Sequence, residues 1–147
     1  MRTRSLILSL LLATPFAAAG NLECNQMKQG MPTIYRCIYH GNLAQAYAAL
    51  STSRSEDRIL RFNFPHHPHL PPALPTRNFS RHGKDLIDYD GDGKNEIYPL
   101  ELTIRHQGSN RVQIDYMESN PGSIYGRKTL LRRKGRNVEI IIKDYAA

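Results

Sequence analysis

The chain has 147 residues, of which 40% are hydrophobic, and its formal net charge is +7. This length fits one ordinary domain with a single core. The positive charge favours anionic partners such as lipopolysaccharide, teichoic acid, nucleic acid or acidic glycans. The charge does not distinguish between these partners, and a simple requirement for solubility accounts for it equally well.

Residues 1–19 have the three parts of a secretory signal peptide. Arg2 and Arg4 form a basic start, an apolar run follows, and three alanines supply a cleavage site near Ala19. The apolar run is short for a membrane span, although a retained anchor is the alternative, and no later stretch is apolar enough to cross a bilayer. We therefore expect one secreted or periplasmic domain over residues 20–147, with a formal charge of +5 once the two arginines are removed.

The two cysteines, Cys24 and Cys37, are separated by a short loop. In an oxidising compartment such a pair favours one disulfide, worth roughly 3 kcal/mol in the chain-entropy model. Redox catalysis would use a C-x-x-C spacing, which the sequence lacks. We therefore expect a structural bridge, with free or intermolecular thiols as the alternative.

Three elements are predicted after the first cysteine. Residues 33–39 are rich in β-branched and aromatic side chains and predict a strand held by the bridge. Asn42 can cap a helix over residues 43–53, in which apolar side chains fall on one face. Residues 58–64 alternate between apolar and polar side chains, which predicts another strand. These are ordinary features of a scaffold.

Residues 65–77 contain five prolines, which exclude a regular helix or a central strand and predict an extended loop. His66, His67 and His69 are candidate ligands for a transition metal. No cysteine or carboxylate stands beside them, so an exposed linker is the alternative. The same loop is also a candidate docking surface for a partner domain that binds proline-rich segments.

The stretch D-Y-D-G-D-G-K-N-E is the one that implies a specific ligand. Asp88, Asp90 and Asp92 fall at alternate positions, and Glu96 comes four residues later. Carboxylates this close repel one another, and Lys94 alone cannot neutralise all four. A calcium ion, which takes about six to eight oxygen ligands, would do so. A solvated acidic turn is the alternative, because Asp and Gly are also common turn residues.

This stretch begins like an EF-hand loop and then departs from it, because Pro99 stands where the closing glutamate belongs. The shorter pattern D-x-D-x-D-G-x-x-E resembles the calcium loops of integrin-type FG-GAP and VCBS-like repeats and, more loosely, those of dockerins and thrombospondin type 3 repeats. The pattern covers about ten residues and occurs once, so it implies no propeller. The resemblance implies that calcium is bound, mainly for structural reasons, by Asp88, Asp90, Asp92, Glu96 and the backbone oxygen of Lys94.

After this loop the chain alternates regularly between apolar and polar side chains. Strands are expected over residues 98–105, 111–117, 124–131 and 138–143, with turns between them. Such consecutive strands form an antiparallel meander, which buries one face of the sheet and exposes the other to solvent. The expected fold class is therefore mainly β (α+β), with a C-terminal antiparallel meander of about four strands, one short helix and an N-terminal strand tethered by the disulfide.

Six basic residues lie within ten residues of one another at the third turn of the meander. They are candidates for binding phosphates or sulfated glycans. The alternative is that basic side chains at turns and edges keep sheets from aggregating. Nucleic acid is not favoured, because Tyr125 is the sole aromatic side chain near them in the sequence. The candidate anion-binding residues are Arg127, Lys128, Arg132, Arg133, Lys134 and Arg136.

The sequence contains no H-E-x-x-H, no nucleophile motif and no phosphate-binding glycine loop. His82 or His106 could form an acid–base pair with Glu101 or Asp115, but the spacing selects none of these pairs. We therefore expect an exported calcium-binding accessory or binding protein of the cell envelope or exterior, with an anionic envelope polymer or a protein as its partner, rather than an enzyme. A calcium-dependent hydrolase of an anionic polymer is one alternative, and an inhibitor or immunity protein against a secreted toxin is another.

Overall fold

The structure is a computed structural model that describes residues 22–52, 71–87, 91–120 and 123–146. These residues form seven strands and one helix, so the prediction of a mainly β protein with one helix is confirmed. The strands are β1 (Leu22–Lys28), β2 (Thr33–His40), β3 (Phe79–Ile87), β4 (Glu96–His106), β5 (Arg111–Asn120), β6 (Ser123–Lys134) and β7 (Asn137–Ala146), and the helix is α1 (Leu43–Thr52).

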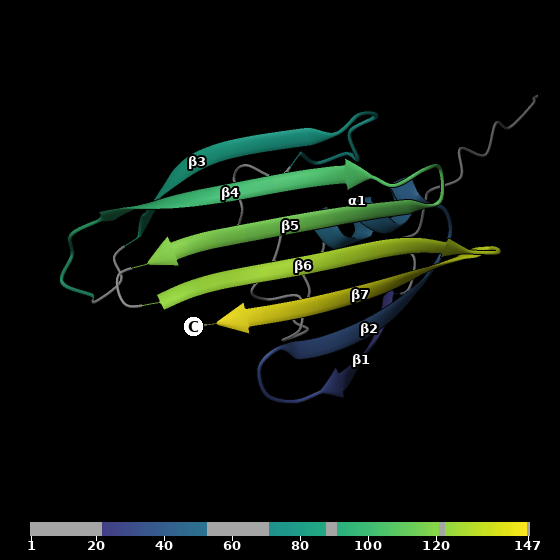
Figure 1. Cartoon of the computed structure of the whole chain (residues 1–147), viewed down its shortest axis with the longest axis horizontal. Helices are drawn as coiled ribbons and strands as arrows, with labels where there is room; N and C mark the ends of the chain where they lie inside the picture. The colour runs from purple at the N-terminus through teal and green to yellow at the C-terminus, as the bar shows by residue number, and fades with distance from the viewer. Residues whose placement is uncertain (1–21, 53–70, 88–90, 121–122, 147) are drawn as a thin grey trace, which may run out of the picture.

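All seven strands belong to one antiparallel sheet, in the order β1-β2-β7-β6-β5-β4-β3 (Figure 1). The predicted meander is confirmed, because β4 to β7 pair in sequence order, and a hairpin adds β3 beside β4. The sequence did not predict that β2 pairs with β7, with Cys37 opposite Ile140. The hairpin of β1 and β2 therefore extends the sheet beyond the last strand of the chain.

The helix α1 lies against one face of the sheet, which we call the covered face (Figure 1). Its start is fixed by a reciprocal cap: the Asn42 side-chain oxygen accepts a hydrogen bond of 2.8 Å from the backbone N–H of Gln45, and the Gln45 side-chain oxygen accepts one of 3.0 Å from the N–H of Asn42. This confirms Asn42 as the predicted cap. Tyr47 and Leu50 of α1 are buried.

The described part of the proline-rich loop, residues 71–77, forms neither helix nor strand. It is fastened to its surroundings through its carbonyl groups. The Ser51 hydroxyl donates to the carbonyl of Pro72 (3.0 Å), and a ring nitrogen of His106 lies 2.7 Å from the carbonyl oxygen of Pro75. The predicted strand over residues 58–64, together with His66, His67 and His69, lies outside the described residues.

The core lies between the covered face and α1. Successive side chains of a strand point to opposite faces of the sheet, so alternate residues over much of β2 and of β4 to β7 enter this core. Full burial of one such aliphatic side chain contributes about 1.5–3 kcal/mol. The intervening residues point to the other face, which no described helix covers and which we call the open face (Figure 1). The core side chains include Cys37, Tyr47, Leu50, Leu100, Leu102, Ile104, Val112, Ile114, Leu131, Val138, Ile140 and Ile142.

The predicted disulfide between Cys24 and Cys37 is confirmed. The two cysteines lie opposite each other in β1 and β2 and are 13 residues apart in the sequence. Because β1 is an edge strand among the described strands and pairs there with β2, the bridge fastens this edge of the sheet.

Candidate functional site: the open face of the sheet

The acidic stretch connects β3 to β4, and Ile87 pairs with Glu96 at its two ends. Gly91 and Gly93 have φ values of 74° and 83°, which favour glycine. Glycine at these two positions therefore allows a tight turn, which suits a calcium loop and a plain acidic turn alike. Of the four predicted carboxylate ligands, Asp88 and Asp90 lie outside the described residues.

The other predicted ligands in this loop are held by nearby groups. One oxygen of Asp92 accepts a hydrogen bond of 2.8 Å from the backbone N–H of Lys94, and the other lies 3.4 Å from the Lys94 ammonium. Glu96 accepts a hydrogen bond from the Tyr98 hydroxyl. Among the described residues, no group of three or more His, Cys, Asp or Glu could hold a metal ion. The turn and Asp92 fit a calcium loop, whereas Glu96 would have to share its carboxylate with Tyr98.

The structure separates the six candidate anion-binding residues. Arg127 points to the covered face, where it is 3% exposed and bound to Asp144, whereas its neighbour Lys128 is exposed on the open face. Arg133 and Arg136 are exposed at the end of the β6–β7 hairpin. The remaining two candidates, which lie on the open face, are brought together with residues that the sequence did not indicate.

Arg132 and Lys134 meet on the carboxylate of Glu139, and Arg36 of β2 joins them. The distances to this carboxylate are 2.8 Å from Arg36, 2.8 Å from Arg132 and 3.0 Å from Lys134. The Glu139 side chain is only 8% exposed. Hydrogen bonds from Lys134, Arg36 and Arg132 outweigh this burial and lower the pKa of Glu139 to about 2.

This cluster carries more positive than negative charge. Arg111 of β5 lies directly opposite Arg132, so a fourth basic residue lies beside the three that contact the Glu139 carboxylate. In addition, the Nε atom of Arg132 is buried and has no hydrogen-bond acceptor among the described residues. We call this group, Arg36, Arg111, Arg132, Lys134 and Glu139, the basic cluster.

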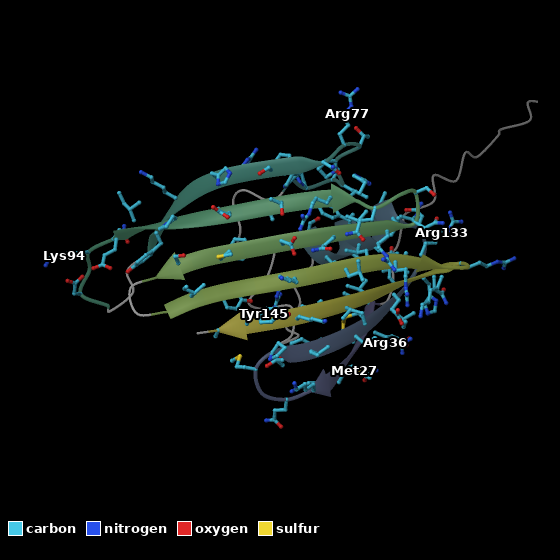
Figure 2. The ribbon with its side chains drawn as sticks, viewed as in Figure 1. Met27, Arg36, Arg77, Lys94, Arg133 and Tyr145 are labelled. Atoms are coloured by element: carbon cyan, nitrogen blue, oxygen red, sulfur yellow. A yellow bond between two sulfur atoms is a disulfide. The ribbon has the colours of Figure 1, made fainter. Side chains whose placement is uncertain are left out.

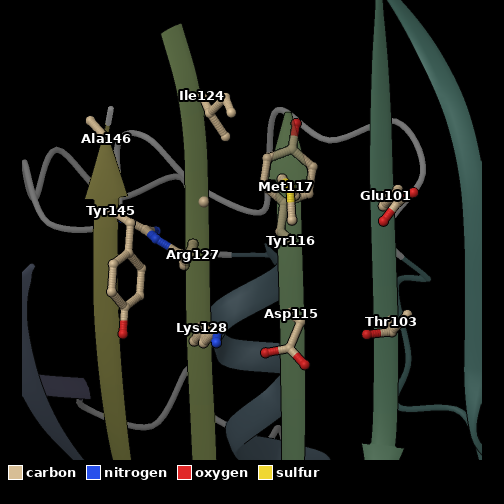
Figure 3. Close-up of a pocket in the computed structure, with 11 residues that line it drawn as sticks. Glu101, Thr103, Asp115, Tyr116, Met117, Ile124, Arg127, Lys128, Tyr145 and Ala146 are labelled. Atoms are coloured by element: carbon tan, nitrogen blue, oxygen red, sulfur yellow. The ribbon is translucent and has the colours of Figure 1, made fainter. Parts of the chain in front are cut away.

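The open face is also hollowed at a second place, over Gly126 of β6. A cavity of about 450 Å³ lies there between Met117 of β5 and Tyr145 of β7, the two residues opposite Gly126 in register (Figure 3). Met117 and Tyr145 are exposed, and so is Ile124 at the same hollow. The hollow therefore presents an apolar surface. Its rim includes the polar side chains of Glu101, Thr103, Asp115 and Lys128.

The candidate acid–base residues form no enclosed pair. His82 and Glu101 lie opposite each other on β3 and β4, with 3.5 Å between ring nitrogen and carboxylate, and their side chains are 75% and 60% exposed. His106 is instead bound to the loop at Pro75, and Asp115 accepts a hydrogen bond from Arg105. A solvated pair at this distance fits a surface contact better than general acid–base catalysis.

Comparison with known proteins adds no constraint: no family model, no curated protein and no solved structure matches this chain. Within the described residues, no helix is long and apolar enough to cross a membrane.

Proposed function

We propose that this protein is an exported accessory or binding protein of the cell envelope or exterior that holds an anionic polymer on the open face of its sheet. The basic cluster carries the proposal. Arg36, Arg132 and Lys134 converge on Glu139, and Arg111 lies opposite Arg132. A single carboxylate leaves excess positive charge for phosphate, sulfate or carboxylate groups of a ligand.

The contacts within the cluster would prepare it for binding. Glu139 already holds three long side chains in place before a ligand binds. These side chains therefore lose little further rotamer freedom on binding, which lowers the entropy cost of association. The Arg36 and Arg132 side chains remain 44% and 41% exposed, so a ligand can reach them. Arginine can bind anionic groups through two parallel hydrogen bonds.

Protection against aggregation does not account for these positions. Basic side chains that serve this purpose lie on edge strands or turns. Arg36 and Arg132 lie on β2 and β6, which have a neighbouring strand on each side. Their charges therefore interrupt no exposed strand edge.

Export is supported by the disulfide as well as by the signal-like residues 1–19. Cysteines pair stably in oxidising compartments, and Cys24 and Cys37 are bonded in the structure. The protein would therefore meet its ligand in the periplasm or outside the cell.

Calcium belongs to this proposal as a structural ion at residues 88–96. The support comes from the alternate carboxylates and from the positive φ angles of Gly91 and Gly93. Lys94 in this loop and Arg133 beside the basic cluster lie at opposite ends of the sheet (Figure 2). The ion would therefore stiffen the hairpin of β3 and β4 rather than contact the bound polymer.

Heparin and polyphosphate are suitable probes for this proposal. Their affinity for the protein should fall as the salt concentration rises, because binding releases counterions. Replacing Arg36, Arg111 and Arg132 with Gln should remove most of this affinity. The matched control replaces Arg77, Lys84 and Lys94 with Gln, which removes the same charge elsewhere. Equal losses in the two triple variants, or no binding by the parent protein, would refute the proposal.

The single variant Arg111→Gln guards against a folding artefact. Arg111 forms none of the three ion pairs of Glu139, so its removal leaves them in place. We expect a smaller loss of heparin affinity with an unchanged near-ultraviolet circular dichroism spectrum. Full affinity in this variant would count against a contribution from Arg111.

A further inference from the structure

Gly126 lies in the middle of β6, and nothing in the backbone requires a glycine there. Its pairing is continuous on both sides, with Met117 opposite in β5 and Tyr145 opposite in β7, so there is no bulge. Its φ angle is not among the positive ones. A Cβ atom would meet only the backbone oxygen of Tyr116, at 3.6 Å, which is an ordinary contact. Since glycine weakens a strand, its role at this position lies in the space that it leaves open.

That space has the size and lining of a small-molecule site. Its volume of about 450 Å³ falls within the range of known ligand pockets, about 300–1,000 Å³. Met117, Ile124 and Tyr145 surround the glycine and are 46%, 51% and 37% exposed (Figure 3). An apolar group placed over Gly126 would remove all three from water, which is favourable.

Two lysines lie beside the hollow, whereas its own rim carries the carboxylates of Glu101 and Asp115. The Lys128 ammonium lies 5.8 Å from the centre of the Tyr145 ring. Lys128 and Lys143 lie directly opposite each other on β6 and β7, and like charges in this arrangement destabilise a sheet. Neither lysine forms an ion pair with a described residue. Asp115 is the other neighbour of Lys128, but its carboxylate already accepts hydrogen bonds from Arg105 and Gln113. An anionic group between the two lysines would relieve their repulsion.

We propose that the hollow over Gly126 binds the apolar part of an amphipathic anion, an aliphatic chain or aromatic ring whose carboxylate or phosphate lies between Lys128 and Lys143. The inference rests on the proposed function and deepens it, because the hollow opens on the same face as the basic cluster. Arg132 follows Gly126 by six positions on β6, about 20 Å along the strand. A polymer that bears an acyl chain could therefore occupy both places.

Laurate is the probe, and dodecyl maltoside is its uncharged counterpart with an alkyl chain one carbon longer. Both are titrated calorimetrically below their micelle concentrations. Gly126→Leu fills the hollow and should weaken laurate binding at least about tenfold, whereas Gly126→Ala leaves most of the space and should change it less than about threefold. Replacing Lys128 and Lys143 with Gln should weaken laurate about tenfold and leave dodecyl maltoside unchanged. Replacing Lys84 with Gln, on the edge strand, should change neither.

Several outcomes would overturn the inference. Laurate could bind the parent and a folded Gly126→Leu variant equally well, or not at all. A dimer that Gly126→Leu dissociates, with no laurate binding, would show that a second copy of the chain covers the hollow. If Gly126→Leu fails to fold, the double variant Met117→Ser and Tyr145→Ser removes two walls instead and should also weaken laurate about tenfold.

Heparin titration of the same variants separates the two proposals. Gly126→Leu should leave heparin affinity within about twofold of the parent, because the basic cluster is intact. Heparin binding without laurate binding would overturn the inference about the hollow and leave the polymer proposal standing. Laurate binding without heparin binding would overturn the polymer proposal alone.

Discussion

The guanidinium group of Arg127 donates two hydrogen bonds, of 2.5 and 2.6 Å, to the carboxylate of Asp144 in the neighbouring strand. The Arg127 and Asp144 side chains are 3% and 17% exposed, so the pair is largely removed from water. The Tyr125 hydroxyl lies 3.5 Å from the same carboxylate, and burial raises the pKa of Tyr125 to about 12. This contact fastens β7 to β6 on the covered face.

Replacing Arg127 with Met should therefore destabilise the protein strongly. The substitution leaves the Asp144 carboxylate buried without its main partner, which typically costs roughly 3–5 kcal/mol. The free energy of unfolding is measured by urea denaturation. Arg133→Met, which removes an exposed arginine of the same strand, is the control and should cost less than about 0.5 kcal/mol.

The double variant Arg127→Met and Asp144→Leu tests the origin of that loss. Because both charges are then absent, most of the lost stability should return. If the stability losses of the two single substitutions simply add in the double variant, Arg127 acts through packing rather than through its ion pair.

Glu139 should contribute stability that depends on pH. Its pKa is lowered from 4.5 to about 2 in the folded protein, chiefly by the hydrogen bond from Lys134. A lowered pKa means that this stability is fully present above pH 4.5 and is lost as the pH falls towards 2. The difference in unfolding free energy between the parent and Glu139→Gln should therefore shrink over this range. Glu101→Gln, an exposed control, should show little difference, and a constant gap for Glu139→Gln would contradict the prediction.

The disulfide should hold the edge of the sheet. Replacing Cys24 and Cys37 with Ala opens a bridge between residues 13 apart, so the unfolding free energy should fall by about 3 kcal/mol. Hydrogen exchange should accelerate most in β1, which is an edge strand of the described sheet. Equal acceleration across β1, β6 and β7 would show instead that the bridge stabilises the whole sheet.

Calcium should raise the melting temperature if residues 88–96 bind it. At one hundred times the dissociation constant, a ligand specific for the folded state adds about 2.7 kcal/mol, which corresponds to about 5 °C or more. Asp92→Ala should abolish the difference between calcium and chelator, whereas Glu23→Gln, an exposed carboxylate on β1, should preserve it. Identical melting of the parent with calcium and with chelator would leave the acidic turn as the correct interpretation.

The sequence predicted the local elements well because the signals for them are local. Asn42 marked the start of α1, and the alternation of side chains placed the strands of the meander. The turns between these strands are short, so each strand pairs with the next one. By contrast, β1 has little strand-forming composition, and its place depends on β2 and the disulfide.

The basic cluster could not be predicted, because it depends on a pairing between distant strands. Alternation shows which residues share a face of one strand, but not which remote strand lies beside it. Arg36 and Glu139 are 103 residues apart and meet only because β2 pairs with β7.

The sequence alone could have predicted that Arg127 and Lys128 point to opposite faces of the sheet. Neighbouring residues of a strand point to opposite faces, and Arg127 shares its face with Thr129 and Leu131, which are both fully buried. The prediction that the six basic residues act together was based on their closeness in sequence and did not take this alternation into account.

The most direct test of the open face as a binding surface is lysine labelling with and without bound heparin. Acylation of each amino group is measured by mass spectrometry. Lys128, Lys134 and Lys143 should be protected severalfold, whereas Lys94, at the tip of the hairpin of β3 and β4, should react at an unchanged rate. Protection of Lys94 with unaltered labelling of the other three would contradict the account.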